Sequence, residues 1–293
     1  MKNLKGTFTA LITPFKNGAI DFPSLDKMMK HQLENGVDGF VINGTTAESP
    51  TLTNSEKEEL FKHARQFCGD KVPLIMGTGS NSTAQTIEDS KKAEKLGADA
   101  VLVVVPYYNK PPQRGLFQHF KAVAESVKIP TILYNVPGRT ITSLEVNTIR
   151  DLSKVAGVVG IKEASGKIDL ASEIIKTCGS NFVMLSGDDG TYVDFLGAGG
   201  NGVISVASHV IPRQMAQWKK WAEAGEIAKA KADIAKYSDL INLLFCEANP
   251  IPVKKALQLM GLTSSAELRL PLVELSPEHT EKLQLEMKKV GLL

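Results

Sequence analysis

The stretch Gly157-Val-Val-Gly-Ile-Lys-Glu-Ala164 holds a short apolar run that ends in a lysine. Continuous apolar runs of about four to eight residues are typical of parallel strands that are buried on both faces. The chain holds eight such runs, at residues 7–12, 39–42, 73–76, 100–105, 131–134, 158–161, 182–185 and 202–206. Strands that alternate with helices in this way predict an α/β fold, the (β/α)8 or TIM barrel. We expect residues 1–211 to form the barrel and residues 212–293 to form additional helices that complete the barrel and pack on it.

Helix signals lie between and after the runs. Thr53 and Glu56 have the capping-box spacing, which predicts a helix start. Apolar residues at helical spacing follow, and the predicted stripes are Leu60, Ala64 and Phe67; Leu116, Phe120, Val123, Ala124 and Val127; Ile227, Ala228, Ala232 and Ala235; and Val253, Ala256, Leu257 and Met260. Stripes of this kind usually pack against a core and imply no cofactor.

The composition limits the kind of partner. The 293 residues contain 34 Lys and Arg against 32 Asp and Glu, so the formal charge is only +2. This balance argues against nucleic acid or an anionic membrane and favours a small substrate. Cys68, Cys178 and Cys246 have neither metal-ligand nor disulfide-framework spacing, and no signal peptide or membrane-length apolar segment is found. We expect a soluble, cytoplasmic protein.

Lys162 is unusual at the end of a buried strand. Burial disfavours the charged ammonium and leaves more free amine, a nucleophile that forms Schiff bases with ketones. The alternative is a structural lysine whose stem is buried and whose ammonium reaches solvent. The segment alone leaves both interpretations open.

Polar segments follow the other runs at the barrel end where reactive residues are expected. They are residues 44–49, 77–81, 106–109, 134–139 and 186–189. These segments are rich in hydroxyl groups and contain no histidine, so we expect no metal.

Individual residues of these segments have a functional and a structural interpretation. Tyr134 could carry protons for Schiff-base chemistry or be a half-buried aromatic at the rim. Thr45 and Thr46 could bind substrate or form a turn, and Arg139 could bind a carboxylate or be an ordinary surface arginine. The glycine-rich stretch 197–202 precedes the last strand, so it predicts a tight turn at the opposite mouth rather than a phosphate loop.

Seven motifs extend this interpretation: GTTAES at 44–49, YYNKP at 107–111, YNVPGRT at 134–140, GIKEA at 160–164, SGDD at 186–189, GVIS at 202–205 and NPIPVK at 249–254. In their order and over almost the whole chain they resemble the 4-hydroxy-tetrahydrodipicolinate synthases (dihydrodipicolinate synthases), a family of pyruvate-dependent Schiff-base lyases. The barrel with C-terminal helices that the resemblance implies agrees with the count of eight runs.

The resemblance implies a reaction and a role for several residues. Pyruvate would form a Schiff base with Lys162 and then condense with L-aspartate 4-semialdehyde, in the diaminopimelate route to lysine, without a cofactor. Tyr134 would exchange protons, and Thr45 and Tyr108 would continue the relay, with Tyr108 supplied by a neighbouring subunit of a homo-oligomer, a tetramer built from dimers.

The resemblance also implies the binding residues. Thr46 and the backbone of Ile204 would hold the pyruvate carboxylate, and Gly187 would line the pocket. Arg139 would bind the carboxylate of aspartate semialdehyde.

Three other functions compete with this interpretation. A pyruvate-dependent lyase for a sugar acid, of the N-acetylneuraminate or keto-deoxy-gluconate type, usually differs at the threonine pair and at the arginine. A catalytically silent barrel that binds a 2-keto acid would have no need of Lys162, Tyr134 and Thr45 together. A phosphate- or flavin-binding barrel is the third, and the chain has neither a Walker loop nor a Gly-x-Gly-x-x-Gly after a strand.

Two features depart from the family pattern. Arg114 stands where the family often has glutamate, near the expected subunit contact. In the family's lysine-feedback pocket, this chain matches at Ser49, Asn81 and Tyr107 but has Asn54, Lys57 and Gln85 where regulated members often carry two histidines and a glutamate. We expect an ammonium at Lys57 to repel the ligand's own ammonium groups, so that lysine inhibits weakly or not at all.

Overall fold

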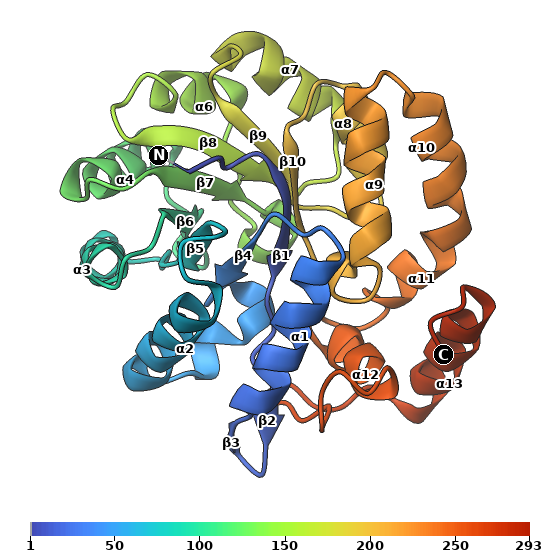
Figure 1. The fold of residues 1–293 in the computed structure, drawn as a ribbon. Coiled ribbons are helices and arrows are strands. Elements are labelled where there is room, and N and C mark those ends of the chain that lie inside the picture. The colour runs from blue at the N-terminus through green and yellow to red at the C-terminus, as the bar shows by residue number, and fades with distance from the viewer. Residues whose placement is uncertain (1) are drawn as a thin grey trace.

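The computed structural model describes residues 2–293, and its centre is a closed barrel of eight parallel strands (Figure 1). The strands are β1 (Gly6–Ala10), β4 (Gly39–Ile42), β5 (Leu74–Gly77), β6 (Ala100–Val104), β7 (Thr131–Asn135), β8 (Val158–Glu163), β9 (Val183–Ser186) and β10 (Gly202–Ser205). Each neighbour in the barrel is the next strand of this series, and β10 closes the ring by pairing with β1. All eight predicted runs are therefore strands, with ends that differ from the predicted ones by at most two residues.

A small hairpin was not predicted. Strands β2 (Phe15–Lys16) and β3 (Ala19–Ile20) pair in antiparallel fashion outside the barrel. Asn17 and Gly18 connect them with φ values of 53° and 80°. An Asn-Gly pair that tolerates two positive φ angles is a strong hairpin signal, so the sequence contained the information.

One helix or more follows each barrel strand and covers its outer face. The ring consists of α1 (Phe22–Glu34), α2 (Asn54–Cys68), α3 (Thr83–Lys95), α4 (Gln113–Ser126), α6 (Val146–Leu152), α7 (Ile168–Cys178), α8 (Tyr192–Gly197) and α9 (Pro212–Glu223). The remaining α-helices are the short α5 (Pro137–Thr140), between β7 and α6, and four in the C-terminal region: α10 (Ile227–Ile234), α11 (Ser238–Leu243), α12 (Ile251–Leu259) and α13 (Pro277–Lys289). Since α9 packs on β1 and α10 packs on α8 and α9, the C-terminal region lies against the barrel, on the right of Figure 1.

Two apolar cores result from this arrangement. The larger one lies between the strands and the helices, and the smaller one fills the inside of the barrel. Side chains inside include Phe8, Ile75, Leu102, Tyr134 and Ile204, all buried. The barrel is thus a packed core with no pore, and its inner side chains form the floor of the mouth above them.

Most helix predictions are confirmed, with two corrections. The capping box of Thr53 and Glu56 starts α2, and Leu60 and Ala64 are buried, but Phe67 is 37% exposed while Phe61 and Cys68 are buried. The predicted face of α10 is wrong as well, because Ala228, Ala232 and Ala235 are exposed and Ala230 is buried. Alanine is small enough to be tolerated on either face, so an alanine-rich stripe predicts orientation poorly.

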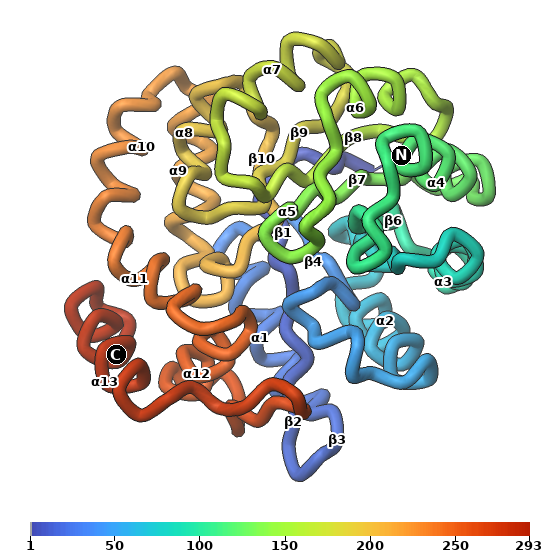
Figure 2. The backbone as a smooth tube through the Cα atoms, turned by 180° about the vertical axis from the view of Figure 1, so that it is seen from behind, coloured from blue at the N-terminus to red at the C-terminus, as the bar shows by residue number. Residues whose placement is uncertain are grey.

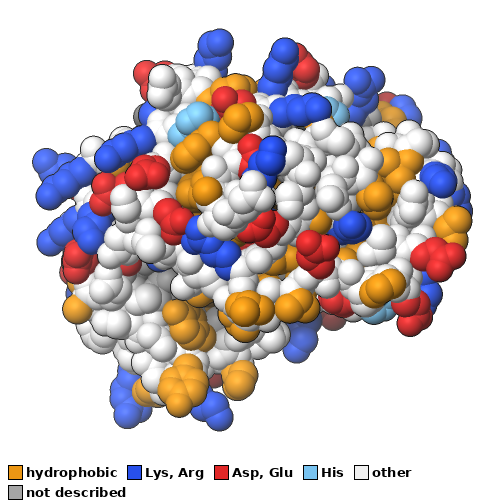
Figure 3. Space-filling view, turned by 90° about the horizontal axis from the view of Figure 1, so that it is seen from below, with side chains coloured by type: hydrophobic (Ala, Val, Ile, Leu, Met, Phe, Trp, Pro, Cys, Tyr) orange, Lys and Arg blue, Asp and Glu red, His pale blue; other side chains and the backbone are white. Residues whose placement is uncertain are grey.

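The surface shows no large area of a single charge on the face seen in Figure 3, where Lys and Arg side chains are interspersed with Asp and Glu. Within residues 2–293, none of the helices is long and apolar enough to cross a membrane. The stretch 197–202 joins α8 to β10 as predicted, and Gly200 is needed there because a Cβ would lie 2.2 Å from the Phe195 ring.

Two buried histidines generate a pH prediction. Burial lowers the pKa of His119 and of His209 to about 4, so both rings are neutral in the fold. In the unfolded chain the pKa is about 6.5, so the unfolded state binds more protons between pH 6.5 and pH 4 and stability falls as the pH falls through this window. We expect each histidine to cost about 2 kcal/mol of unfolding free energy between pH 7 and pH 5. Urea titrations of wild type and His119→Gln check this, and equal pH dependence in the two proteins would contradict it.

Candidate active site

Lys162 and Tyr134 stand side by side at the C-terminal end of the barrel. They lie on the neighbouring strands β8 and β7, and the strand register pairs them directly. Both residues are 7% exposed, and the Lys162 Nζ lies 4.3 Å from the centroid of the Tyr134 ring. The sequence placed both at strand ends, and the register brings amine and phenol into one site.

A buried hydrogen bond fixes this register. Asn135 follows Tyr134, Glu163 follows Lys162, and the Asn135 Nδ2 donates to the Glu163 Oε2 at 2.7 Å. Successive side chains of a strand point to opposite faces, so this pair lies on the other face from Tyr134 and Lys162. The other Glu163 oxygen accepts the N–H of Ser165, and the Asn135 Oδ1 accepts the N–H of Leu144. No local pattern in the sequence indicates a role for this pair.

Gly187 supplies the space that the lysine side chain occupies. It follows β9, and its N–H donates to the Glu163 carbonyl at 2.7 Å. A Cβ at this position would lie 2.7 Å from the Lys162 Cε and 2.5 Å from the Ala164 Cβ. Any side chain here would therefore displace the Lys162 side chain.

The threonine pair approaches the site from β4. Thr45 and Thr46 belong to a single 3₁₀ turn, η1 (Thr45–Ala47). Thr45 and Tyr134 line one small cavity of about 50 Å³ together with Leu102 and Val104. Two hydroxyl-bearing residues that could relay protons therefore share one cavity, and one of them, Tyr134, contacts Lys162.

Asn249 connects Thr46 to Arg139. Its Nδ2 donates to the buried Thr46 hydroxyl at 2.9 Å, and its carbonyl accepts from the Arg139 guanidinium at 3.3 Å. Arg139 is exposed on α5 (Pro137–Thr140), a short helix that lies over the strands at this mouth (Figure 2). The buried Asn249 Oδ1 has no hydrogen-bond partner within residues 2–293. Asn249 lies in a motif that the sequence analysis quoted, but its position between two substrate-binding candidates had no local signal.

Ile204 and Tyr108 occupy different environments. The Ile204 side chain is 1% exposed and belongs to the inner core, so its backbone is the part available to a ligand. Tyr108 is 87% exposed, has a φ of 74° and lies in the loop before α4. Tyr108 is not among the residues that line the cavity of Thr45 and Tyr134.

The chemistry available at this mouth is nucleophilic. Lys162 supplies an amine, Tyr134 and the threonines supply hydroxyls, and Arg139 supplies a fixed cation at the rim. The residues that the structure describes contain no group of three His, Cys, Asp or Glu side chains placed to hold a metal ion.

A second pocket adjoins the first. Its volume is about 280 Å³, and its lining includes Ser49, Asn54, Lys57, Gln85 and Tyr107. The lining shared with the small cavity consists of Asn43, Ser49, Gly77 and Gly79. Most residues expected in a feedback pocket therefore do meet, although Asn81 is not among the lining residues.

The charges of this pocket are more mixed than the sequence suggested. Lys57 is half-buried and makes no ion pair with any residue that the structure describes. Lys92 also lines the pocket but pairs with Glu88 at 2.7 Å. The carboxylates of Glu58 and Asp89 line it as well, whereas the sequence-based expectation rested on Lys57 and on the loss of a glutamate at Gln85.

Comparison with known proteins agrees with this geometry. The sequence profile of the Dihydrodipicolinate synthetase family matches residues 3–290. A 4-hydroxy-tetrahydrodipicolinate synthase from Bdellovibrio bacteriovorus is 81% identical over 293 residues, which is 100% of both chains. The crystal structure of a dihydrodipicolinate synthase from Thermotoga maritima is 44% identical and superposes with a TM-score of 0.97 over 99% of both chains. A dihydrodipicolinate synthase from Acinetobacter baumannii, solved in complex with pyruvate, is 41% identical with a TM-score of 0.97 over 99% of this chain and 100% of that one.

The contact between Gly187 and Lys162 predicts the effect of one added methyl group. In Gly187→Ala the lysine amine must move, and a misplacement of about 1 Å costs about a hundredfold in rate. We expect borohydride trapping of pyruvate on the protein to slow by that order. Gly190→Ala is the matched control, since a Cβ there meets only the Asp188 Oδ1 at 3.6 Å. Equal trapping rates in the two variants would show that the lysine tolerates the displacement.

Proposed function

The chain belongs to the dihydrodipicolinate synthetase family, and from this premise we propose that it condenses pyruvate with L-aspartate 4-semialdehyde to give 4-hydroxy-tetrahydrodipicolinate. The activity is that of a lyase in the diaminopimelate route to lysine. The observation that carries the proposal is the pairing of Lys162 with Tyr134 beside the Thr45 hydroxyl.

The reaction begins with the Lys162 amine, which attacks the keto carbon of pyruvate to give a carbinolamine. Loss of water forms the Schiff base, and Tyr134 donates and accepts the protons that these steps require. Loss of a methyl proton gives an enamine, which attacks the aldehyde carbon of the second substrate. The amine of that substrate then displaces Lys162 as the ring closes, so the lysine returns to its free form and no cofactor is consumed.

Substrate binding divides between the floor and the rim of the mouth. Thr46 and the backbone of Ile204 hold the pyruvate carboxylate, and Gly187 leaves the space for the bound lysine. Arg139 at the rim binds the carboxylate of aspartate semialdehyde, where a charged fork fits a planar anion.

The proposal extends to the assembly. Tyr108 is exposed in one chain, and we assign it to the proton relay of a neighbouring subunit in a homo-oligomer, a tetramer built from dimers. The balanced charge of +2 favours small-molecule substrates. We assign the enzyme to the cytoplasm, because its three cysteines have no disulfide-framework spacing and fit a reducing compartment.

A lyase for a sugar acid is the second candidate. It would share Lys162 and Tyr134 but has less use for a threonine pair and for a cation at the rim, both of which this chain has. The names of the similar proteins also favour the synthase.

Turnover tests the proposal directly. We expect the purified enzyme to consume pyruvate and aspartate semialdehyde together, and to leave N-acetylneuraminate and keto-deoxy-gluconate uncleaved. Borohydride reduction with pyruvate should label the peptide that contains Lys162, and Lys162→Arg should abolish both turnover and label. Turnover of a sugar acid in place of the semialdehyde, or a label on another lysine, would overturn the assignment.

Arg139→Ala separates the two substrates. Loss of a charged hydrogen bond costs about 2 to 3 kcal/mol, so kcat/KM for aspartate semialdehyde should fall by roughly a hundredfold while trapping of pyruvate changes little. Arg150→Ala, at an arginine of α6 that pairs with Asp151, is the control. Wild-type kinetics for the semialdehyde in Arg139→Ala would assign this role to another residue.

The second pocket predicts a weak response to L-lysine. A like charge near a partly desolvated ligand costs about 1 kcal/mol or more, which weakens binding roughly five- to tenfold. At saturating pyruvate we expect half-inhibition only at millimolar lysine or above, and Lys57→Ala should lower that concentration. Strong inhibition of the wild type below the millimolar range would show that Glu58 and Asp89 outweigh Lys57.

A further inference from the structure

A buried ion pair lies behind the threonine turn, and the proposed mechanism makes no use of it. The Glu48 carboxylate meets the Lys254 ammonium, with side-chain exposures of 0% and 1%. Burial lowers the pKa of Lys254 to about 8, an effect that the Glu48 carboxylate opposes, so the ammonium form is retained at neutral pH. Charges that are removed from water in this way require partners in fixed positions.

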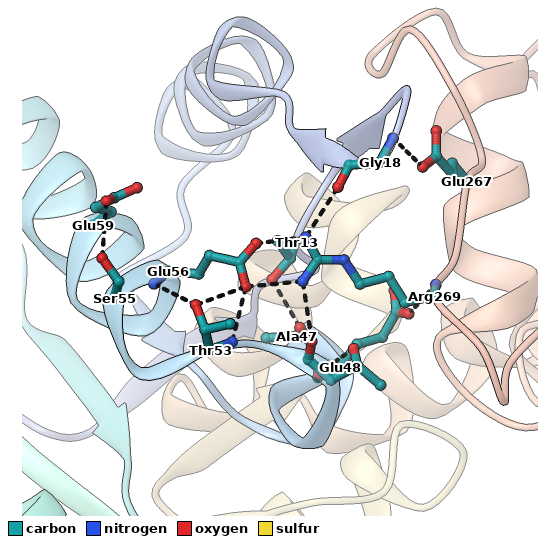
Figure 4. A network of polar contacts seen from close by, with 11 residues as sticks. Thr13, Gly18, Ala47, Glu48, Thr53, Ser55, Glu56, Glu59, Glu267 and Arg269 are labelled. Carbon is teal, nitrogen blue, oxygen red and sulfur yellow. Dashed lines mark hydrogen bonds and ion pairs between the residues drawn. The ribbon is translucent and has the colours of Figure 1, made fainter.

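The pair belongs to a network of polar contacts between residues 48–56 and residues 254–269, and Figure 4 shows part of this network. The Glu48 Oε2 accepts the backbone N–H of Arg269 at 3.0 Å, and the Lys254 Nζ donates to the Glu267 carbonyl at 2.8 Å. The Arg269 guanidinium donates to the Thr51 carbonyl at 3.0 Å and to the Glu56 carboxylate of the capping box.

The aromatic ring of Phe15 also contacts two residues of this network. The Lys254 Nζ lies 4.2 Å and the Arg269 guanidinium 4.4 Å from the centroid of the Phe15 ring. The C-terminal segment from α12 to Arg269 therefore contacts the chain at several points between the threonine turn and the start of α2.

The backbone also changes direction at Glu48. It has a φ of 55° and separates η1, which carries Thr45 and Thr46, from η2 (Ser49–Thr51). A non-glycine residue in the left-handed region is strained and persists where its surroundings fix it. Here the side-chain contacts with Lys254 and Arg269 do so.

A second contact from the same segment reaches the turn. Asn249 precedes α12, Lys254 lies within α12, and the Asn249 amide holds the Thr46 hydroxyl. One short C-terminal segment thus touches both the hydroxyl and the backbone corner of the threonine turn.

We propose that Glu48 and Lys254 are positioning residues that hold Thr45 and Thr46 in place for the reaction. The inference rests on the proposed function for its kinetic part. It makes the C-terminal region a component of the catalytic apparatus, acting through Glu48 on residues that touch the substrate.

The test compares stability with activity in Glu48→Gln, Lys254→Met and the double variant. Each single variant leaves one buried charge unpaired, so it should lower the melting temperature and also kcat and pyruvate affinity, with kcat at least tenfold below wild type in protein that is fully folded. The double variant has no unpaired charge and should recover melting temperature, yet it has no ion pair and should keep the low kcat. Because it carries neither buried charge, it also serves if a single variant does not fold.

Leu257→Ala is the matched control, since Leu257 is a fully buried apolar residue of the same helix, α12. It should lower the melting temperature without lowering kcat in folded protein. Hydrogen exchange of the peptide that spans residues 44–52 gives a readout independent of activity, and we expect faster exchange in Glu48→Gln and in the double variant than in the control.

Two results would overturn the inference. One is a double variant that regains kcat together with melting temperature, and the other is exchange at residues 44–52 that matches the Leu257→Ala control. Failure of wild-type enzyme to turn over pyruvate with aspartate semialdehyde would instead reject the proposed function, and the hydrogen-exchange comparison would still decide the role of the ion pair.

Discussion

Closure of the barrel is the constraint on which the rest of this structure depends. The first strand pairs with the last, and Gly6 lies opposite Gly202 in that register. The two backbones approach so closely that a Cβ on Gly202 would lie 2.0 Å from the Gly6 carbonyl oxygen. Once the ring is closed, the C-terminal ends of all eight strands face one mouth. Residues as far apart in sequence as Thr46 and Asn249 can then form a hydrogen bond at 2.9 Å.

The two buried lysines illustrate how surroundings decide what an amine can do. Lys254 is paired with Glu48, donates to the Glu267 carbonyl and lies over Phe15, so its proton and its direction are both fixed. Lys162 faces the Tyr134 ring, and no carboxylate among residues 2–293 forms an ion pair with it. An amine without a carboxylate partner is suited to nucleophilic attack, whereas a paired ammonium is suited to structural support.

Much of the fold and part of the site could be predicted from local patterns. Continuous apolar runs identified the eight strands, and Lys162 and Tyr134 were predicted because each ends such a run on neighbouring strands. The Asn17-Gly18 hairpin had a local signal that was overlooked, and the alanine-rich face of α10 had too weak a signal. The contacts of Glu48 with Lys254 and Arg269 could not be predicted, because they join residues more than 200 positions apart, as the separation of 221 for the Arg269 contact illustrates, and follow no periodicity.

The wall that the two pockets share limits which substitutions such a protein can accept during evolution. Asn43, Ser49, Gly77 and Gly79 border both spaces, so a substitution at any of them alters the lining of both pockets at once. Asn54, Lys57 and Gln85 border only the larger space. Mutational drift at these three positions can therefore change the larger pocket while selection for turnover holds the wall itself unchanged.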